Sequence, residues 1–187
     1  MITLLSSTND QHVIRLNRAF RADLAWWRML AANWNGTTPS TTLFTDVSGS
    51  WGCGAFWNQR WLQFHWSESA APLPISVKEM LPIIMAAATW GVQWRGQCVA
   101  CYCDNQAVVA TLASRSSKEE RLAHLLRCLF YFEALYQFEL RGFHIPGTQN
   151  RVADALSLNH IDVFFQHVPR ADPYTRTPSH LGRWKRC

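Results

Sequence analysis

Four acidic residues stand where predicted strands end or predicted helices begin. Asp46 ends the β-rich segment "TTLFTD", and Asp104 ends the apolar segment "CVACYCD". Glu79 lies within "ISVKEM" and Asp154 within "NRVADALS", each near the start of a predicted helix. Carboxylates are the ligands that hard cations prefer over sulfur or imidazole. Four of them projecting from rigid elements therefore predict a site for divalent cations.

Each carboxylate also has an ordinary structural interpretation. Ser76 and Glu79 have the S-x-x-E spacing of a capping box. Asp154 lies in a first helical turn, where the helix dipole favours an anion, and Asp104 precedes a helix that it could cap. Asp46 could start the turn "DVSGS". Taken one at a time, these structural interpretations are favoured. Taken together with the order of the elements, the metal site is favoured.

The elements that must position these acids can be predicted from the spacing of apolar residues. Residues 12–34 have apolar side chains at helical spacing and stop at the turn cluster "NGTTPS", which predicts a helical arm. Residues 41–66 contain three short β-rich segments, which predict an antiparallel meander with a tight turn at Asn58 and Gln59. The remaining pattern predicts, in order, a helix at 76–94, a strand at 97–104, helices at 105–114 and 119–137, a strand at 138–145 and a last helix capped by Asn150.

Length and composition set the frame for these elements. A chain of 187 residues that is 48% hydrophobic predicts one medium domain with extensions. Its formal net charge of +5 favours a polyanionic partner, although this charge alone is weak evidence. We find no apolar run of about 18 residues, and the first residues lack the basic flank and long apolar core of a signal peptide. The expectation is a cytoplasmic or nuclear protein that has no membrane partner.

The cysteines are expected to be reduced side chains of the core. Their six positions do not have the spacing of a secreted disulfide framework. A zinc site at Cys98, Cys101 and Cys103 is a weaker interpretation. Cys101 and Cys103 share one face of a predicted strand, but Cys98 points to the other face and no second ligand pair follows at a suitable spacing. Small buried residues are therefore the favoured interpretation.

Four segments carry a resemblance to a known family. "FTDVSGSWGCGAFW", "SVKEM", "CDNQAVV" and "HIPGTQNRVADALS" resemble, in order, the motifs of the type 1 ribonuclease H domain that follows reverse transcriptase in retrotransposons. The end of the last motif is most similar to gypsy-type and DIRS-type elements. The segment "RADLAWW...NWNG" is similar to the stretch that leads into the DIRS-type domain. The motifs cover residues 43–158.

The resemblance implies a fold and a division of the chain. The implied fold is the ribonuclease H-like α/β fold, with a five-stranded mixed sheet flanked by helices. Residues 1–40 would form a helical arm or connection segment, residues 41–160 the catalytic domain, and residues 161–187 a flexible tail. The implied partner in the cell is a reverse transcriptase domain in the same polyprotein.

The resemblance also implies a reaction. The domain would be a metal-dependent endonuclease that hydrolyses the RNA strand of RNA–DNA hybrids during reverse transcription, with two Mg²⁺ ions that Mn²⁺ can replace. Asp46 would bridge the two ions. Glu79 and Asp104 would bind the ion on the leaving-group side, and Asp154 the ion that activates water.

Three further residues match family positions that contact substrate. Ser48, Ser76 and Gln106 would reach the minor groove, where a 2′-hydroxyl distinguishes RNA from DNA. Each also has an ordinary alternative as a turn residue, a cap or a helix-surface residue.

Aromatic and basic side chains are weaker candidates for substrate contact. Four of the ten tryptophans fall on faces that should meet the core, so packing is favoured over base stacking for Trp51, Trp57, Trp90 and Trp94. A modest basic cluster follows the second predicted helix and could bind a nucleic acid backbone or form a solvated face: Arg115, Lys118 and Arg121.

Two alternatives to the implied function stay open. The first is a catalytically inactive or domesticated ribonuclease H-like domain that binds nucleic acid or a protein partner without cutting. The second is a related nuclease of the same superfamily that cuts DNA. The complete set of four acids argues against an inactive domain, and recognition of the 2′-hydroxyl separates RNA cleavage from DNA cleavage.

Overall fold

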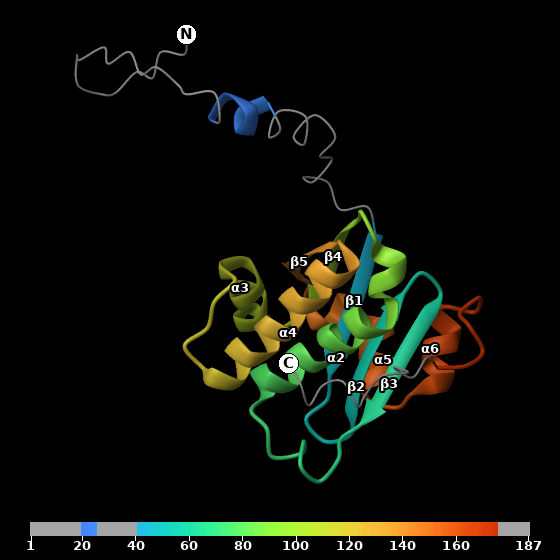
Figure 1. Ribbon diagram of the computed structural model, residues 1–187. Coiled ribbons are helices and arrows are strands. Elements are labelled where there is room, and N and C mark those ends of the chain that lie inside the picture. Colours follow the sequence, from blue (N-terminus) through green and yellow to red (C-terminus); the bar gives the residue numbers. More distant parts are fainter. Residues whose placement is uncertain (1–19, 26–40, 176–187) are drawn as a thin grey trace. The chain divides into compact units, whose positions relative to one another are not determined.

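The computed structural model describes residues 20–25 and 41–175 (Figure 1). The chain divides into two units, Met1–Gly36 and Thr37–Cys187. Residues 20–25 are helical, within the arm that the sequence predicts at residues 12–34. The rest of that arm, and the chain after residue 175, lie outside the described residues.

The second unit is built on one mixed sheet of five strands. Strand β1 lies at its centre, in the order β3-β2-β1-β4-β5. Strands β1, β2 and β3 are antiparallel neighbours, whereas β4 and β5 run parallel to β1. The strands are β1 (Thr41–Val47), β2 (Gly52–Trp57), β3 (Arg60–His65), β4 (Cys98–Cys103) and β5 (Glu139–His144). This arrangement confirms the predicted meander and the predicted five-stranded mixed sheet.

The turn between β2 and β3 forms where the sequence predicts it. Asn58 and Gln59 have φ values of 46° and 66°. Positive φ at both central residues is the requirement of a type I′ turn, whose twist matches that of the flanking strands. The two-residue turn therefore fixes the register of the hairpin, in which Trp57 pairs with Arg60.

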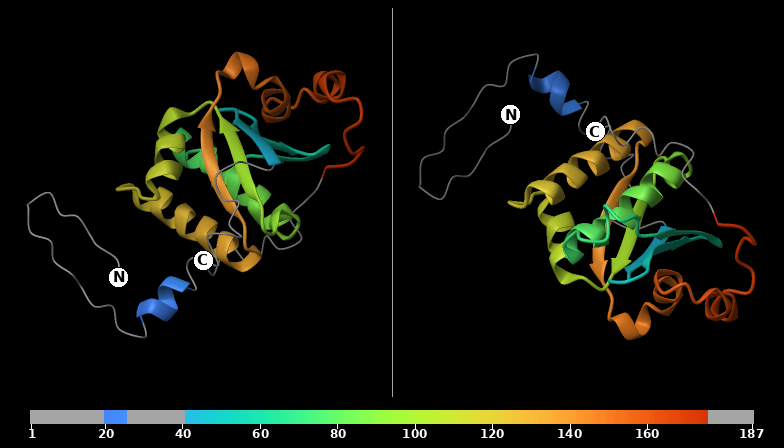
Figure 2. Two further views of the ribbon diagram at one scale, coloured as in Figure 1. Left: turned by 90° about the horizontal axis from the view of Figure 1, so that it is seen from above. Right: turned by 90° about the horizontal axis from the view of Figure 1, so that it is seen from below.

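Helices cover both faces of the sheet (Figure 2). One cluster of buried side chains lies between the sheet and α2, α3 and α4, and a second lies between the sheet and the last two helices. The helical elements are α2 (Ile75–Trp90), η1 (Gly91–Trp94), α3 (Gln106–Ser114), α4 (Glu120–Tyr136), η2 (Gly147–Gln149), α5 (Arg151–Ser157) and α6 (Ile161–His167). Together α2 and η1 span the helix that the sequence predicts at 76–94.

The helix at Ile75–Trp94 is long and apolar enough to cross a membrane by length and composition alone, which the search for apolar runs did not predict. Its most apolar window is 67% buried within the domain. A central helix of a folded domain passes the same test, because it is apolar on most of its circumference. Burial against the sheet therefore accounts for its composition.

Tryptophans fill much of the larger core. Trp57, Trp90 and Trp94 are each at most 5% exposed, and their ring centroids lie 5.7 to 6.3 Å apart. Packing rather than base stacking is thus confirmed for these three. Trp51 is only half-buried and meets the ring of His65 edge-on.

The cysteines of the described residues are core side chains, as predicted. Cys53, Cys101 and Cys103 are free thiols with 0% exposure, and burial raises the pKa of the Cys53 and Cys101 thiols to about 12. Cys98 and Cys128 are also buried. Among residues 20–25 and 41–175, no group of three or more His, Cys, Asp or Glu side chains is already arranged around one metal position.

The fold continues beyond residue 160, where the sequence analysis ends the domain. Helix α6 begins at Ile161, and its Phe164 is fully buried against Trp61 and Phe56. Trp61 also donates its indole N–H to the carbonyl of Asp172 at 2.7 Å. A helix of seven residues is too short to display a clear 3.6-residue period, so the apolar spacing gives no sign of it.

Candidate active site

Asp46 and Asp104 lie side by side at the carboxyl ends of neighbouring strands. Strands β1 and β4 are parallel, and Phe44 stands opposite Tyr102 in their register. Two residues further along, Asp46 lies near the end of β1, and Asp104 directly follows the last residue of β4. The carboxyl ends of parallel strands are the usual place for a ligand site in an open α/β sheet. The predicted proximity of these two acids follows directly from the strand pairing.

Glu79 approaches from helix α2. The helix packs on β1 and β2 and buries Glu79 to 4% exposure. Its Oε2 atom has no hydrogen-bond partner among the described residues. A buried carboxylate oxygen without a donor is costly, and a bound cation would satisfy it.

The capping-box interpretation of Ser76 and Glu79 is wrong. Helix α2 begins at Ile75 with Pro74 at its N-cap, and no side chain caps it. Ser76 is thus already inside the helix, where the capping geometry cannot form. The helix thus begins two residues earlier than the S-x-x-E pattern indicates, with Pro74 rather than Ser76 at the N-cap.

Asp154 is supplied by helix α5, which lies close to the sheet beside Asp46. Gly54 of β2 pairs with Asp46 across the strands. A Cβ atom at Gly54 would collide with the side chain of Leu156 on α5. Only glycine permits this close approach, because any other residue would displace the helix. Asp154 itself stands in the first turn of α5 and is exposed, so its first-turn interpretation stands beside the metal interpretation.

Two residues of α5 and its cap bind Asp46 directly. Ser157, which is fully buried, donates its hydroxyl to Oδ2 of Asp46 at 2.6 Å. Asn150 donates its side-chain N–H to Oδ1 of Asp46 at 3.4 Å and to the carbonyl of Thr45 at 2.9 Å. Asn150 stands at the N-cap of α5 as predicted, but its side chain makes no cap hydrogen bond and instead contacts Asp46 and Thr45.

The sequence analysis did not identify Ser157 as part of the site. A signal was present, because Ser157 follows Asp154 by three residues and therefore lies on the same side of α5. Asn150 was predicted only as the cap of the last helix, not as a partner of Asp46. Both residues belong to the segment "NRVADALS" that singled out Asp154.

The structural interpretations of the two strand acids also fail. The side chain of Asn105, not Asp104, caps α3 by accepting the backbone N–H groups of Ala107 and Val108. Ser48, not Asp46, organises the turn after β1: its Oγ accepts the N–H groups of Trp51 and Gly52. Neither acid has the local backbone role that a cap or turn would require.

The site acids repel one another electrostatically. Burial raises the pKa of the Asp46 carboxyl to about 6; the hydrogen bond from Ser157 lowers it, and the charges of Asp104 and Asp154 raise it. Burial likewise raises the pKa of Glu79 to about 8, and the charges of Asp104 and Asp46 add to the effect. The four carboxylates thus lie within one field of like charge. A divalent cation would relieve this repulsion.

The donor set fits a hard divalent cation, although no three of the described acidic, His or Cys side chains already surround a single metal position. All four donors are carboxylates, and the unpartnered Oε2 of Glu79 is available. Exposure rises from Asp46 and Glu79, which are buried, through Asp104 to Asp154, which is exposed. The site therefore opens to solvent on the side of α5.

The three predicted substrate contacts lie near the acids in sequence and differ in exposure. Ser48 is 6% exposed and its hydroxyl is engaged in the turn after β1. Ser76 is half-buried, one helical turn before Glu79, and Gln106 is exposed at the start of α3. Their contact with substrate stays a prediction.

The predicted basic cluster is divided by the structure. Arg115 forms a bidentate ion pair with Glu133, with a shortest distance of 2.8 Å, and donates to the carbonyl of Leu140. It therefore joins the α3–α4 loop to β5. Lys118 and Arg121 are exposed.

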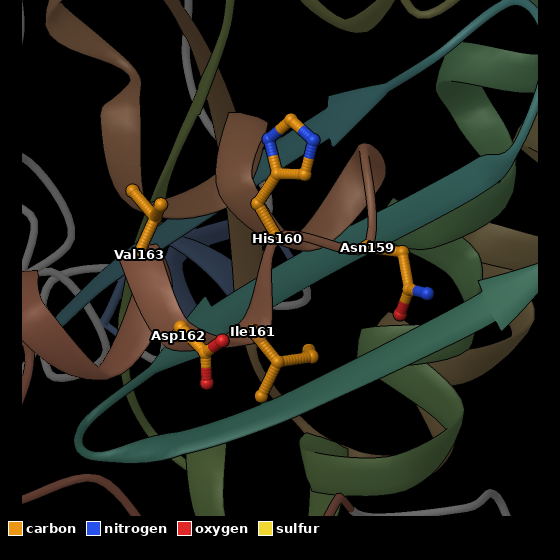
Figure 3. Close-up of a pocket in the computed structure, with 5 residues that line it drawn as sticks. All are labelled: Asn159, His160, Ile161, Asp162 and Val163. Atoms are coloured by element: carbon orange, nitrogen blue, oxygen red, sulfur yellow. The ribbon is translucent and has the colours of Figure 1, made fainter.

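A pocket lies at the turn between α5 and α6 (Figure 3). It is lined by Asn159, His160, Ile161, Asp162 and Val163. None of the four acids lines it. Gln63 of β3 donates to Asn159 and to the carbonyl of Leu156, which ties this turn to the sheet.

Comparisons with known proteins identify the fold. No protein-family model and no curated protein matches the chain. The solved structure of LC11-RNase H1 in complex with an RNA/DNA hybrid aligns with 66% of this chain and 97% of its own, at 19% identity and a TM-score of 0.53. RNase H1 from the halophilic archaeon Halobacterium salinarum NRC-1 aligns with 65% of this chain and 97% of its own, at 15% identity and a TM-score of 0.46.

The sheet order, the flanking helices and the first of these similarities define an α/β protein of the ribonuclease H-like class. The described unit has the ribonuclease H-like fold that the sequence analysis predicted.

Proposed function

We propose that this protein is a metal-dependent endonuclease that hydrolyses the RNA strand of RNA–DNA hybrids. The observation that carries the proposal is the convergence of Asp46, Glu79, Asp104 and Asp154, whose charges act on one another at the carboxyl ends of β1 and β4. The fold supports it, because LC11-RNase H1, solved in complex with an RNA/DNA hybrid, shares this architecture.

The residues that would bind the metal are the four acids. Asp46 would be shared between two Mg²⁺ ions, with Glu79 and Asp104 on one ion and Asp154 on the other. When bound, such a pair supplies an activated water and neutralises charge on the attacking and leaving oxygens. Mn²⁺ would substitute, because it also accepts carboxylate ligands.

The protein's own contribution is to position and desolvate these ligands. Ser157 and Asn150 fix the orientation of the Asp46 carboxylate through its two oxygens. Burial excludes water from Asp46 and Glu79, which strengthens their attraction for a cation. The exposure of Asp154 leaves its side of the site open to water and to a nucleic acid backbone.

Recognition of RNA is assigned to three polar residues around the acids. Ser48, Ser76 and Gln106 follow or precede the acids by two or three positions in the sequence, and in this proposal their side chains would face the substrate beside the acids. A hydroxyl or amide there would bind the 2′-hydroxyl in the minor groove. The formal charge of +5 adds nonspecific attraction for the phosphate backbone.

The biological setting that we propose is a retroelement of the DIRS or gypsy type. The segments quoted for the resemblance support it, and in that setting a reverse transcriptase domain of the same polyprotein would produce the hybrid. The reaction would then take place in the cytoplasm or nucleus.

A cleavage assay on matched duplexes tests the function. We expect the protein to cut the RNA strand of an RNA–DNA hybrid with Mg²⁺ or Mn²⁺ and to be inactive with a chelator. An all-DNA duplex of the same sequence should stay intact. Equal cleavage of the DNA duplex would favour the DNA-cutting alternative. Binding of the hybrid without cleavage under either metal would favour the inactive alternative.

A further inference from the structure

The geometry points to Ser157 as a positioning residue: we propose that its hydroxyl fixes helix α5 against Asp46, so that Asp46 and Asp154 are held at the separation needed to bind cations together. This inference rests on the proposed function, because it gives Ser157 a purpose only if these acids bind metal. It concerns a residue that does not itself contact the cation.

The hydrogen bond to Asp46 has the features of a strong interaction. At 2.6 Å it is in the short range typical of a hydroxyl that donates to a carboxylate. Ser157 is fully buried and Asp46 is 6% exposed, so water does not compete for either group. Loss of the donor would leave a buried carboxylate oxygen unsatisfied.

The same hydroxyl has a second acceptor, the carbonyl oxygen of Asp154 at 3.0 Å. A serine hydroxyl has one proton and donates it to one acceptor at a time. The carboxylate is both closer and charged, so it receives the proton while Asp46 is ionised. Ser157 therefore lies between the carboxylate of one predicted metal ligand and the backbone of another.

Helix α5 is attached to Asp46 at both of its ends. Asn150 precedes the first residue of the helix and donates to Oδ1 of Asp46, whereas Ser157 is its last residue and donates to Oδ2. Asp154 lies between these two attachments. The two oxygens of one carboxylate thus set the placement of the helix that carries the other carboxylate.

Close contact with the sheet completes this arrangement. Gly54 lets α5 approach β2, and Leu156 fills the space that a side chain at Gly54 would need. This packing sets how near the helix lies to the sheet. The hydrogen bonds of Asn150 and Ser157 set the direction of the Asp46 carboxylate relative to it.

A serine near the end of a helix has an ordinary alternative role, in which its hydroxyl donates to a carbonyl of the preceding turn, and the exposed Ser114 is a control for that hydrogen bond. Ser114, at the end of α3, donates its hydroxyl to the carbonyl of Thr111, three residues earlier, at 3.3 Å. Ser157 bears the same relation to Asp154. Ser114 has no carboxylate partner among the hydrogen bonds of the described residues. Ser114 also donates to the carbonyl of Ser116 at 3.1 Å, so Ser114→Ala removes hydrogen bonds to backbone carbonyls and none to a carboxylate.

The test measures Mn²⁺ binding by electron paramagnetic resonance on the full chain, without substrate. Partners that orient a metal ligand typically contribute about 10-fold to 100-fold in metal affinity. We expect Ser157→Ala to weaken Mn²⁺ binding by at least about tenfold. Ser157→Thr keeps the hydroxyl and should restore most of the affinity, and Ser114→Ala should bind as the wild type does.

Melting temperatures of the metal-free proteins accompany the titrations. We expect Ser157→Ala to fold but to melt below the wild type, because a buried oxygen of Asp46 loses its donor. Recovery of both the melting temperature and the Mn²⁺ affinity in Ser157→Thr assigns the weaker binding to the lost hydroxyl. Wild-type affinity in Ser157→Ala would overturn the inference. So would an equal loss in Ser157→Ala and Ser157→Thr, which would assign the effect to packing, or a Ser157→Ala protein that does not fold. If the wild type itself binds no Mn²⁺, the proposed function fails instead.

Discussion

At the scale of single residues, the site is defined by carboxylates that the fold makes unstable as anions. Asp46 and Glu79 are buried beside one another's charges, and no basic side chain of the described residues forms an ion pair with either. An acid with a purely structural role would cap a helix, organise a turn or form an ion pair with an arginine. The ordinary interpretations of three of the four acids fail for this reason, and only the first-turn position of Asp154 is also that of a structural anion.

Stability without metal should fall as pH rises. The pKa of Glu79 is about 8 in the folded protein and 4.5 as its ordinary value. As the pH rises between these values, the unfolded chain ionises more readily than the folded one, so the free energy of unfolding decreases. Glu79→Gln removes this penalty and should raise the free energy of unfolding by on the order of 4 kcal/mol at pH 8, with little change at pH 4, since one pKa unit corresponds to about 1.4 kcal/mol. Urea denaturation with a chelator at both pH values measures it. The exposed Glu68→Gln is the control; a Glu79→Gln protein that is less stable at pH 8 would contradict the argument.

Metal binding should release protons at neutral pH. Because the pKa of Glu79 lies near 8 and that of Asp46 near 6, part of the metal-free population is protonated at pH 7, and a cation displaces those protons. Calorimetric titration with Mg²⁺ in two buffers of different ionisation enthalpy should therefore give different apparent enthalpies. The difference should shrink at pH 9. Identical enthalpies in both buffers at pH 7 would show that the ligands are already ionised.

At the scale of elements, strands β1 and β4 bring two acids together, and helices α2 and α5 add one each from either face of the sheet. Gly54 lets α5 lie close to the sheet, because a Cβ atom at that position would collide with Leu156. This explains why a glycine stands in the middle of a strand, where it would otherwise weaken the sheet.

Gly54→Ala should displace α5 and disturb the site more than the fold. The added Cβ would collide with Leu156, and such overpacking costs about 1 to 3 kcal/mol of unfolding free energy. Hybrid cleavage should fall by a larger factor than the decrease in the folded fraction of the protein, because Asp154 moves relative to Asp46. Gly49→Ala is the control for stability, since a Cβ there meets nothing within 4 Å. Full cleavage activity in a folded Gly54→Ala protein would contradict this argument, because it would show that the site tolerates a displacement of α5.

The sequence analysis predicted the elements more completely than the contacts between them. Alternation and the turn residues Asn58 and Gln59 predict the meander because they act locally. The hydrogen bonds from Asn150 and Ser157 to Asp46 join residues 104 and 111 positions apart, and no local pattern encodes such a contact. The capping box failed because Pro74 starts the helix before Ser76, so two local signals competed.

At the scale of the whole molecule, the described fold ends later than the sequence indicates. Helix α6 and the residues up to 175 cover the β2–β3 half of the sheet face that carries α5. Phe164 is the central residue of this smaller cluster, with three aromatic neighbours. The second cluster supports α5 and hence the site.

Phe164→Ala should destabilise the whole domain. Removal of a fully buried phenylalanine costs about 3 to 5 kcal/mol, because it forfeits burial and leaves a cavity. Phe143→Ala, which changes a residue that is 36% exposed, should cost clearly less. Chemical denaturation of both variants measures the difference. Equal stabilities would mean that α6 is not part of the cooperative unit.

The central claim is that the four acids form a metal-dependent catalytic site, and the most direct measurement is hybrid cleavage by Asp46→Asn in Mg²⁺. The substitution removes the proposed shared ligand while its neighbours remain, so we expect cleavage to fall by several orders of magnitude in a protein that melts no lower than the wild type. Asp162→Asn, a change in the first turn of α6 away from the four acids, should cleave normally. Cleavage by purified Asp46→Asn at a rate near that of the wild type would contradict the account.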